Sequence, residues 1–127
     1  MPKKILIVDD DPDMVEAVTM ILESKGFEVA AAYGGIEGMQ KVETEKPDLI
    51  VLDVMMPDKD GYTVCKELKA NPDLKEIPIL LLTAVVSQIP KTRYTQRMGI
   101  ETEADDFMDK PVDPALLVKR VETLLSK

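Results

Sequence analysis

Carboxylates follow two apolar runs of this sequence. Asp9, Asp10 and Asp11 come directly after the run at 5–8, and Asp53 ends a second run. Two carboxylates about 4 Å apart repel by roughly 4 kcal/mol at an effective dielectric constant of 20, so a fold that gathers them needs a cation between them. The chain has no histidine, and hard oxygen ligands without histidine or cysteine favour Mg²⁺ over zinc. These acids therefore predict a magnesium site.

A hydroxyl and an ammonium group follow two further apolar segments. Thr83 ends the run that starts at Ile79, and Lys110 comes shortly after Phe107. A carboxylate beside Mg²⁺ and a lysine is suited to attack a phosphoryl group, because the two cations neutralise the oxygens of the group in transfer. This set predicts phosphoryl transfer to a carboxylate.

Each of these residues also has an ordinary structural interpretation. The alternatives are a helix cap for Asp11, solvated loop acids for Asp9 and Asp10, a strand end held by backbone donors for Asp53, a core position for Thr83 and a surface position for Lys110. Each alternative is reasonable alone, but together they do not explain why complementary groups follow successive apolar runs.

The elements that carry these residues alternate between strand and helix. Strands are expected at 5–8, 27–32, 49–53, 79–83 and 107–108, and helices at about 12–26, 36–46, 62–70 and 114–125, with another helix after Pro90. Asp11-Pro12 and Asp113-Pro114 each resemble an N-cap followed by proline at the first helical position. We therefore predict an α/β fold, a doubly wound five-stranded parallel sheet with helices on both faces. Ligands of such folds bind beyond the carboxyl ends of the strands, where the polar groups described above lie.

Composition limits the class of protein. The 127 residues suit one domain, 1–127, and the net charge of −8, from 24 acids and 16 bases, disfavours nucleic-acid binding by this chain alone. The single cysteine, Cys65, allows no internal disulfide and suits a core position. We expect a cytoplasmic protein, since no secretory signal and no apolar run long enough to span a membrane is apparent.

Four segments of the chain resemble the signature segments of response-regulator receiver domains. They are Ile-Val-Asp-Asp-Asp-Pro at 7–12, Leu-Asp-Val-Met-Met-Pro-Asp-Lys-Asp-Gly at 52–61, Leu-Thr-Ala at 82–84 and Ala-Asp-Asp-Phe-Met-Asp-Lys-Pro at 104–111. They occur in the family's order, and the resemblance covers nearly the whole chain. It implies the flavodoxin-like receiver fold.

The resemblance also implies a role for individual residues. Asp53 matches the phosphoacceptor. Asp9 and Asp10 match the acidic pair that binds Mg²⁺, with Asp10 the more direct ligand, and Met55 matches the position whose backbone carbonyl binds the metal. Asp53 itself completes the metal ligands.

Three further matches concern the response to phosphorylation. Thr83 matches the hydroxyl that bonds the phosphoryl oxygen, Lys110 the lysine that pairs with the phosphate, and Phe107 the switch aromatic that turns inward on activation. Met55 and Val85 match the positions that flank the path of an attacking water. Both are apolar, so we expect slow self-dephosphorylation.

The expected function is a phosphorylation-controlled signalling switch rather than an enzyme with turnover. Because the chain lacks histidine, the phosphoryl group must come from a sensor histidine kinase, a histidine phosphotransfer protein or a small acyl phosphate, and an unidentified partner receives the output. One alternative is an unphosphorylated docking module, which would predict a damaged site. Another is an aspartyl-phosphate phosphohydrolase, which would need an acid where Met55 stands.

Overall fold

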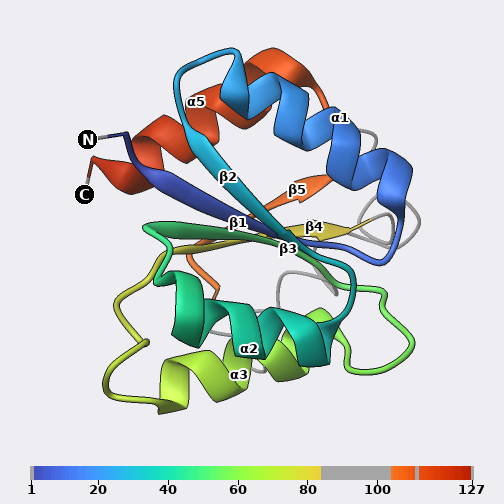
Figure 1. Ribbon diagram of the computed structural model, residues 1–127, viewed down its shortest axis with the longest axis vertical. Helices are drawn as coiled ribbons and strands as arrows, with labels where there is room; N and C mark the ends of the chain where they lie inside the picture. Colours follow the sequence, from blue (N-terminus) through green and yellow to red (C-terminus); the bar gives the residue numbers. More distant parts are fainter. Residues whose placement is uncertain (1, 84–103, 111, 127) are drawn as a thin grey trace, which may run out of the picture.

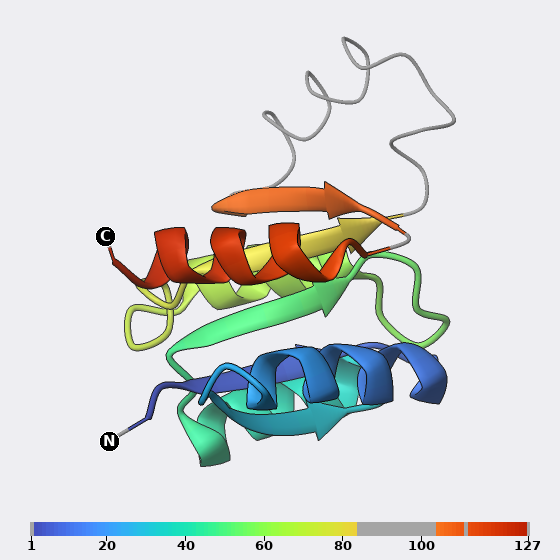
Figure 2. The same ribbon diagram turned by 90° about the horizontal axis from the view of Figure 1, so that it is seen from above.

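The strands form one parallel sheet in the order β2-β1-β3-β4-β5. The computed structural model describes residues 2–83, 104–110 and 112–126. The strands are β1 (Lys4–Val8), β2 (Glu28–Ala32), β3 (Leu49–Asp53), β4 (Ile79–Thr83) and β5 (Asp106–Asp109). Figure 2 shows them side by side and pointing the same way, so their carboxyl ends meet at one edge. The predicted five-stranded parallel sheet is confirmed.

Helices cover both faces of this sheet. They are α1 (Pro12–Glu23), α2 (Gly35–Glu45), α3 (Gly61–Ala70) and α5 (Pro114–Leu125). In Figure 1, α1 and α5 lie on one face, and α2 and α3 lie on the other. None of the described helices has the length and apolar character that a membrane crossing requires. The segment 84–103, where a helix was expected after Pro90, lies outside the described residues.

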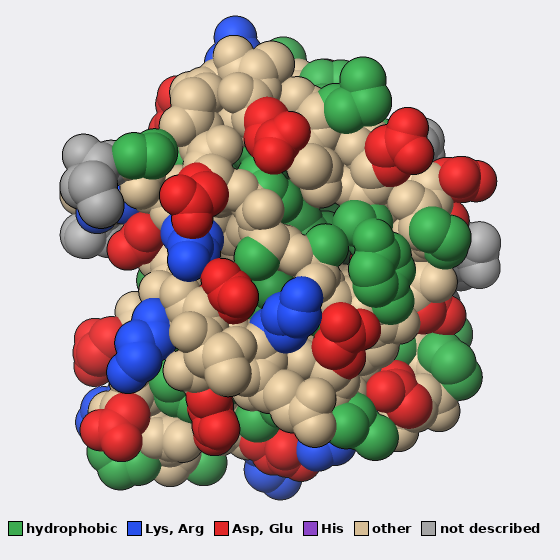
Figure 3. All heavy atoms as spheres, viewed as in Figure 1, with side chains coloured by type: hydrophobic (Ala, Val, Ile, Leu, Met, Phe, Trp, Pro, Cys, Tyr) green, Lys and Arg blue, Asp and Glu red, His purple; other side chains and the backbone are tan. Residues whose placement is uncertain are grey.

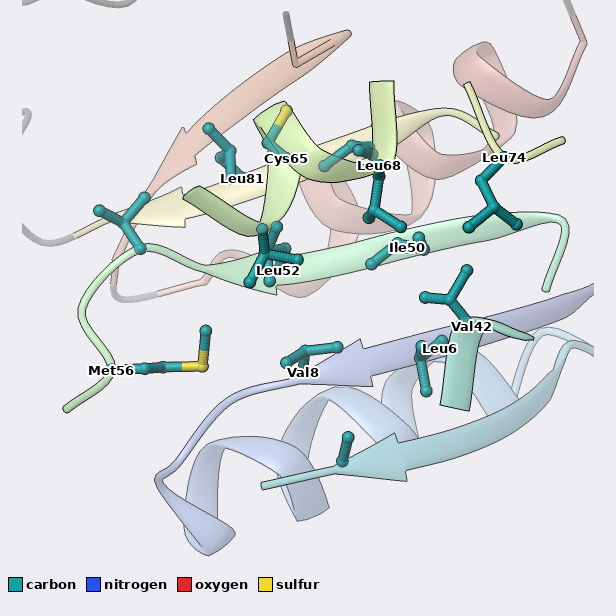
Figure 4. Close-up of a cluster of buried hydrophobic side chains, with 14 residues drawn as sticks. Leu6, Val8, Val42, Ile50, Leu52, Met56, Cys65, Leu68, Leu74 and Leu81 are labelled. Atoms are coloured by element: carbon teal, nitrogen blue, oxygen red, sulfur yellow. The ribbon is translucent and has the colours of Figure 1, made fainter. Parts of the chain in front are cut away.

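The two faces of the sheet carry separate hydrophobic clusters. Along β1, Ile5 and Ile7 pack under α1 and α5, whereas Leu6 and Val8 pack under α2 and α3. This alternation follows from the two-residue period of a strand, and it explains why the central strands are apolar throughout. Figure 4 shows the cluster beneath α2 and α3, which includes Cys65 in the predicted core position.

Helix α1 begins where its cap predicts. Asp11 is the N-cap, and its carboxylate accepts a hydrogen bond of 3.0 Å from the backbone N–H of Asp13. The same arrangement starts α5, where Asp113 accepts from Ala115 N–H at 3.2 Å. Both predicted caps are confirmed. Each directly follows a strand–helix loop, so the caps fix where the loops at the carboxyl edge end.

Gly26 closes helix α1, as predicted. The last helical residue is Glu23, and in the turn that follows, Gly26 N–H donates to the Glu23 carbonyl at 3.0 Å and Phe27 N–H donates to the Leu22 carbonyl at 3.2 Å. Gly26 lies in that turn at a φ of 90°, a conformation that glycine adopts readily. Helix α3 begins one residue earlier than expected, since Asp60 caps it.

Candidate functional site

Two neighbouring strands bring the first acids together. Asp9 follows β1 and Asp53 ends β3, and the pairing of Val8 with Leu52 sets these acids side by side. Both are buried, with 1% and 3% of their surface exposed, whereas Asp10 is exposed. One carboxylate oxygen from each of the three acids lies within 4.8 Å of the others. The predicted acidic cluster is therefore present.

Lys110 bridges the two buried acids. Its Nζ lies 2.9 Å from Asp53 Oδ1 and 3.1 Å from Asp9 Oδ2. Its backbone N–H donates to the carbonyl of Thr83 at 2.9 Å, which continues the β4–β5 ladder one residue beyond the pairing of Thr83 with Asp109. The sheet itself thus delivers the ammonium group to the acids.

Burial and charge act in opposite directions at this pair. Burial raises the pKa of Asp53, the hydrogen bond from Lys110 lowers it, and the Asp9 charge raises it again, so the net shift is upward. For Lys110, burial lowers the pKa, but the hydrogen bonds to Asp53 and Asp9 raise it more. An ion pair alone would lower the pKa of its acid. The upward shift at Asp53 shows that one lysine does not offset both burial and the neighbouring carboxylate.

The donor set fits a divalent cation. When ionised, the three acids exceed the single ammonium by two negative charges. Both oxygens of Asp9 are already engaged, Oδ1 by the backbone N–H of Asp11 at 3.0 Å and Oδ2 by Lys110. The exposed carboxylate of Asp10 is therefore better placed than that of Asp9 to bind a cation directly. Hard oxygen donors of this kind suit Mg²⁺.

The remaining predicted residues lie on β4, on β5 and in the loop after β3. Thr83 is fully buried at the end of β4. Phe107 pairs with Leu81 and is partly buried against the cluster beneath α2 and α3. Met55 exposes 62% of its surface beside the acids. Val85 lies outside the described residues.

The structure adds one residue to which the sequence patterns assigned no role. The carboxylate of Asp58, in the loop between β3 and α3, accepts hydrogen bonds from the backbone N–H groups of Gly35 and Ile36, at 3.0 and 3.1 Å. The signal in the sequence is indirect. A helix that starts at Gly34-Gly35 has no capping side chain of its own, so its cap must come from elsewhere.

Acidic side chains on one face of the molecule are scattered instead of gathered. Figure 3 shows them spread over the face that carries α1, β2 and α2, in keeping with the net charge of −8. The close group at 9, 10 and 53 is thus a local arrangement of the strand ends, and the general acidity of the chain does not account for it.

Known proteins match this chain along its whole length. The family model "Response regulator receiver domain" matches residues 5–122. The alkaline phosphatase synthesis transcriptional regulatory protein PhoP of Bacillus subtilis is 44% identical over all 127 residues, which span 50% of that protein. The chain thus covers about half the length of this curated relative.

Solved structures match the fold as well. A putative response regulator from Chloroflexus aurantiacus is 37% identical with a TM-score of 0.89, and the match covers 100% of both chains. The BeF3-activated N-terminal receiver domain of Klebsiella pneumoniae RstA is 29% identical with a TM-score of 0.81, over 98% of this chain and 99% of that one.

Proposed function

The chain belongs to the response regulator receiver domain family, and we propose that it is a phosphorylation-controlled switch with Asp53 as its phosphoacceptor. One observation carries the proposal. Lys110 Nζ contacts both Asp53 and Asp9 while a third carboxylate, that of Asp10, lies within 4.8 Å. A nucleophile, an ammonium group and an excess of negative charge that suits a divalent cation are thereby combined at the carboxyl edge of the sheet.

The chemistry is phosphoryl transfer from a partner's phosphohistidine. A carboxylate oxygen of Asp53 attacks the phosphorus, the new P–O bond forms an acyl phosphate, and the P–N bond breaks with its electron pair going to the histidine nitrogen. Lys110 pairs with the oxygens of the transferred group. The phosphohistidine would belong to a sensor histidine kinase or a histidine phosphotransfer protein, because this chain has no histidine.

Three side chains and one carbonyl would hold Mg²⁺. They are the carboxylates of Asp9, Asp10 and Asp53 and the backbone carbonyl of Met55, with Asp10 the more direct ligand of the acidic pair. When bound, the ion supplies charge neutralisation for the phosphoryl oxygens. The upward pKa shift of Asp53 supports the need for such a cation.

Thr83 and Phe107 would convert the phosphorylation of Asp53 into a change of the partner-binding face. We assign the Thr83 hydroxyl to a phosphoryl oxygen and Phe107 to the inward movement that follows. The backbone hydrogen bond from Lys110 to the Thr83 carbonyl supports this assignment, since it ties the end of β4 to the end of the strand that carries Phe107. The output passes to a further partner.

The proposed function is that of a cytoplasmic switch, without catalytic turnover and without nucleic-acid or membrane binding by this chain alone. Its only reactions are its own phosphorylation and a slow self-dephosphorylation. The exposed, apolar Met55 beside the acids supports the slow decay, because it cannot orient an attacking water. The intact acidic cluster weighs against an unphosphorylated docking module.

The test is chemical phosphorylation followed by intact-mass measurement. With Mg²⁺ and acetyl phosphate, the wild type should gain one phosphoryl group and Asp53→Ala none. Asp48→Ala is a matched control, because Asp48 lies at the opposite edge, where it accepts the backbone N–H of Lys4. This control should be labelled like the wild type. Full labelling of Asp53→Ala would refute the assignment.

A further inference from the structure

Helix α2 lacks a cap of its own. Its N-cap is Gly34, which has extended backbone angles (φ −177°, ψ 167°) and no side chain to accept the first N–H groups. Such groups need an acceptor at every helix start. Asp58 provides it from 22 and 23 residues away, with one carboxylate oxygen for Gly35 and the other for Ile36. Capping across the fold joins two elements, whereas an ordinary cap joins a helix to its own preceding residue.

The loop that carries Asp58 is seated directly on the start of α2. A Cβ atom on Gly34 would lie 2.8 Å from Asp58 Oδ2, and one on Gly35 would collide with the backbone carbonyl of Lys59. Figure 1 shows this loop, between β3 and α3, beside the first turn of α2. The two glycines therefore make room for the loop.

This same loop carries Met55. Its ends are joined by the hydrogen bond of 2.9 Å from Gly61 N–H to the Val54 carbonyl. Its middle is held by Met56, which is 7% exposed and points toward Val8 in the core (Figure 4). Asp58 holds the outer tip. The hydrogen bonds from Ile36 and Gly35 also lower the pKa of Asp58, so it is ionised at neutral pH.

We infer that Asp58 is a positioning residue for the metal site: by capping α2 from the β3–α3 loop, it fixes the segment whose Met55 carbonyl would bind Mg²⁺. The inference rests on the proposed function. A carbonyl ligand contributes more to affinity when its backbone is already held in place, because any freedom of the loop must be lost when the ion binds. Residues that support metal ligands affect affinity in this way without touching the ion.

The experiment is a calorimetric Mg²⁺ titration of the full chain, well below the lowest melting temperature of the variants. Asp58→Ala should raise the Mg²⁺ dissociation constant about tenfold, the lower end of what supporting residues contribute. Asp58→Glu keeps the charge but displaces the carboxylate, so it should also weaken binding. Wild-type affinity in Asp58→Glu would show that charge alone matters. Asp48→Ala, which loses the same charge at the opposite edge, should bind normally.

A double variant separates positioning from simple helix capping. Asp58→Ala removes the carboxylate that a side chain at position 34 would meet, so Gly34→Ser can be added to cap α2 locally. The double variant should regain melting temperature but keep the weak Mg²⁺ binding of Asp58→Ala. Recovery of wild-type affinity would overturn the inference. Failure of the wild type itself to bind Mg²⁺ would instead sink the proposed metal site, and the inference with it.

Discussion

Replacing Asp10 with asparagine should stabilise the metal-free protein. The exposed carboxylate of Asp10 has an oxygen within 4.8 Å of oxygens of the buried Asp9 and Asp53. Asp9 and Asp10 are chain neighbours, so much of their mutual repulsion persists after unfolding. The repulsion between Asp10 and Asp53, which are distant in sequence, is created by folding. Asp10→Asn removes that repulsion with almost no change in shape.

The magnitude follows from Coulomb's law. Two charges at 4.8 Å repel by about 3.5 kcal/mol at an effective dielectric constant of 20 and by about 0.9 kcal/mol at 80. Asp10 is exposed, so solvent screening places the value near the lower limit. A gain of about 1 kcal/mol in the free energy of unfolding raises the melting temperature of a domain of this size by roughly 3–6 °C. Added salt should shrink the gain.

Excess Mg²⁺ should reverse the order of the two proteins. Ligand binding stabilises the native state by about 2.7 kcal/mol at one hundred times the dissociation constant, and Asp10→Asn binds the ion more weakly. The assay is thermal unfolding in EDTA and in excess Mg²⁺. Asp11→Asn is the control, because asparagine caps α1 about as well as aspartate and the charge loss is the same. The reasoning fails if Asp10→Asn melts below the wild type in EDTA and its Mg²⁺ affinity is unchanged, since Asp10 would then be structural.

Three further predictions concern the loop after β3 and the first residue of α3. Met55→Asn should shorten the lifetime of the phosphorylated protein in Mg²⁺, since a polar group in place of the exposed thioether can orient an attacking water. An unchanged rate of decay would show that the apolar side chain of Met55 does not slow dephosphorylation. Gly61→Ala should lower the free energy of unfolding by more than about 1 kcal/mol despite the better helix propensity of alanine, because its Cβ would collide with the Asp53 carbonyl and lie 2.8 Å from the Val54 Cα. Chemical denaturation measures this free energy, and a variant more stable than the wild type would contradict the contact. Hydrogen bonds from Ile36 and Gly35 lower the pKa of Asp58 below its ordinary 3.8. The contribution of the ionised Asp58 to stability is therefore present above pH 3.8 and lost as the pH falls through the folded-state pKa. The melting temperatures of wild type and Asp58→Asn should converge in acid, and a difference that does not change with pH would argue against an ionised cap.

The sheet and the site were predictable because they share one signal. A central strand buried on both faces leaves a continuous apolar run, and the first polar residue after it lies at the carboxyl edge. Asp9, Asp53 and Thr83 each occupy such a position, and the structure places them at strand ends. Lys110 follows this signal less closely, because β5 has only two apolar residues at its centre and Asp109 comes before the lysine. Short-range patterns were sufficient wherever the chemistry followed a strand directly.

The missed feature depends on contacts between distant segments. Nothing near Asp58 in the sequence indicates that it caps a helix starting at Gly35, because the partner lies more than twenty residues earlier. At Asp58 a polar side chain finds a backbone partner in another element, which periodicity does not report.

The bond between Lys110 N–H and the Thr83 carbonyl gives the proposed switch a direct mechanical link. Lys110 and Thr83 are the two residues assigned to the phosphoryl group, and this bond of 2.9 Å makes their backbones move together. Without phosphate, the Lys110 ammonium group is held by Asp53 and Asp9. We expect a phosphoryl group on Asp53 to compete for the Lys110 ammonium group, and the backbone bond would couple a movement of Lys110 to the end of β4. Phe107 lies on β5, three residues before Lys110, and is only partly buried, so the proposed switch aromatic is carried by the strand that leads to the proposed phosphate-binding lysine.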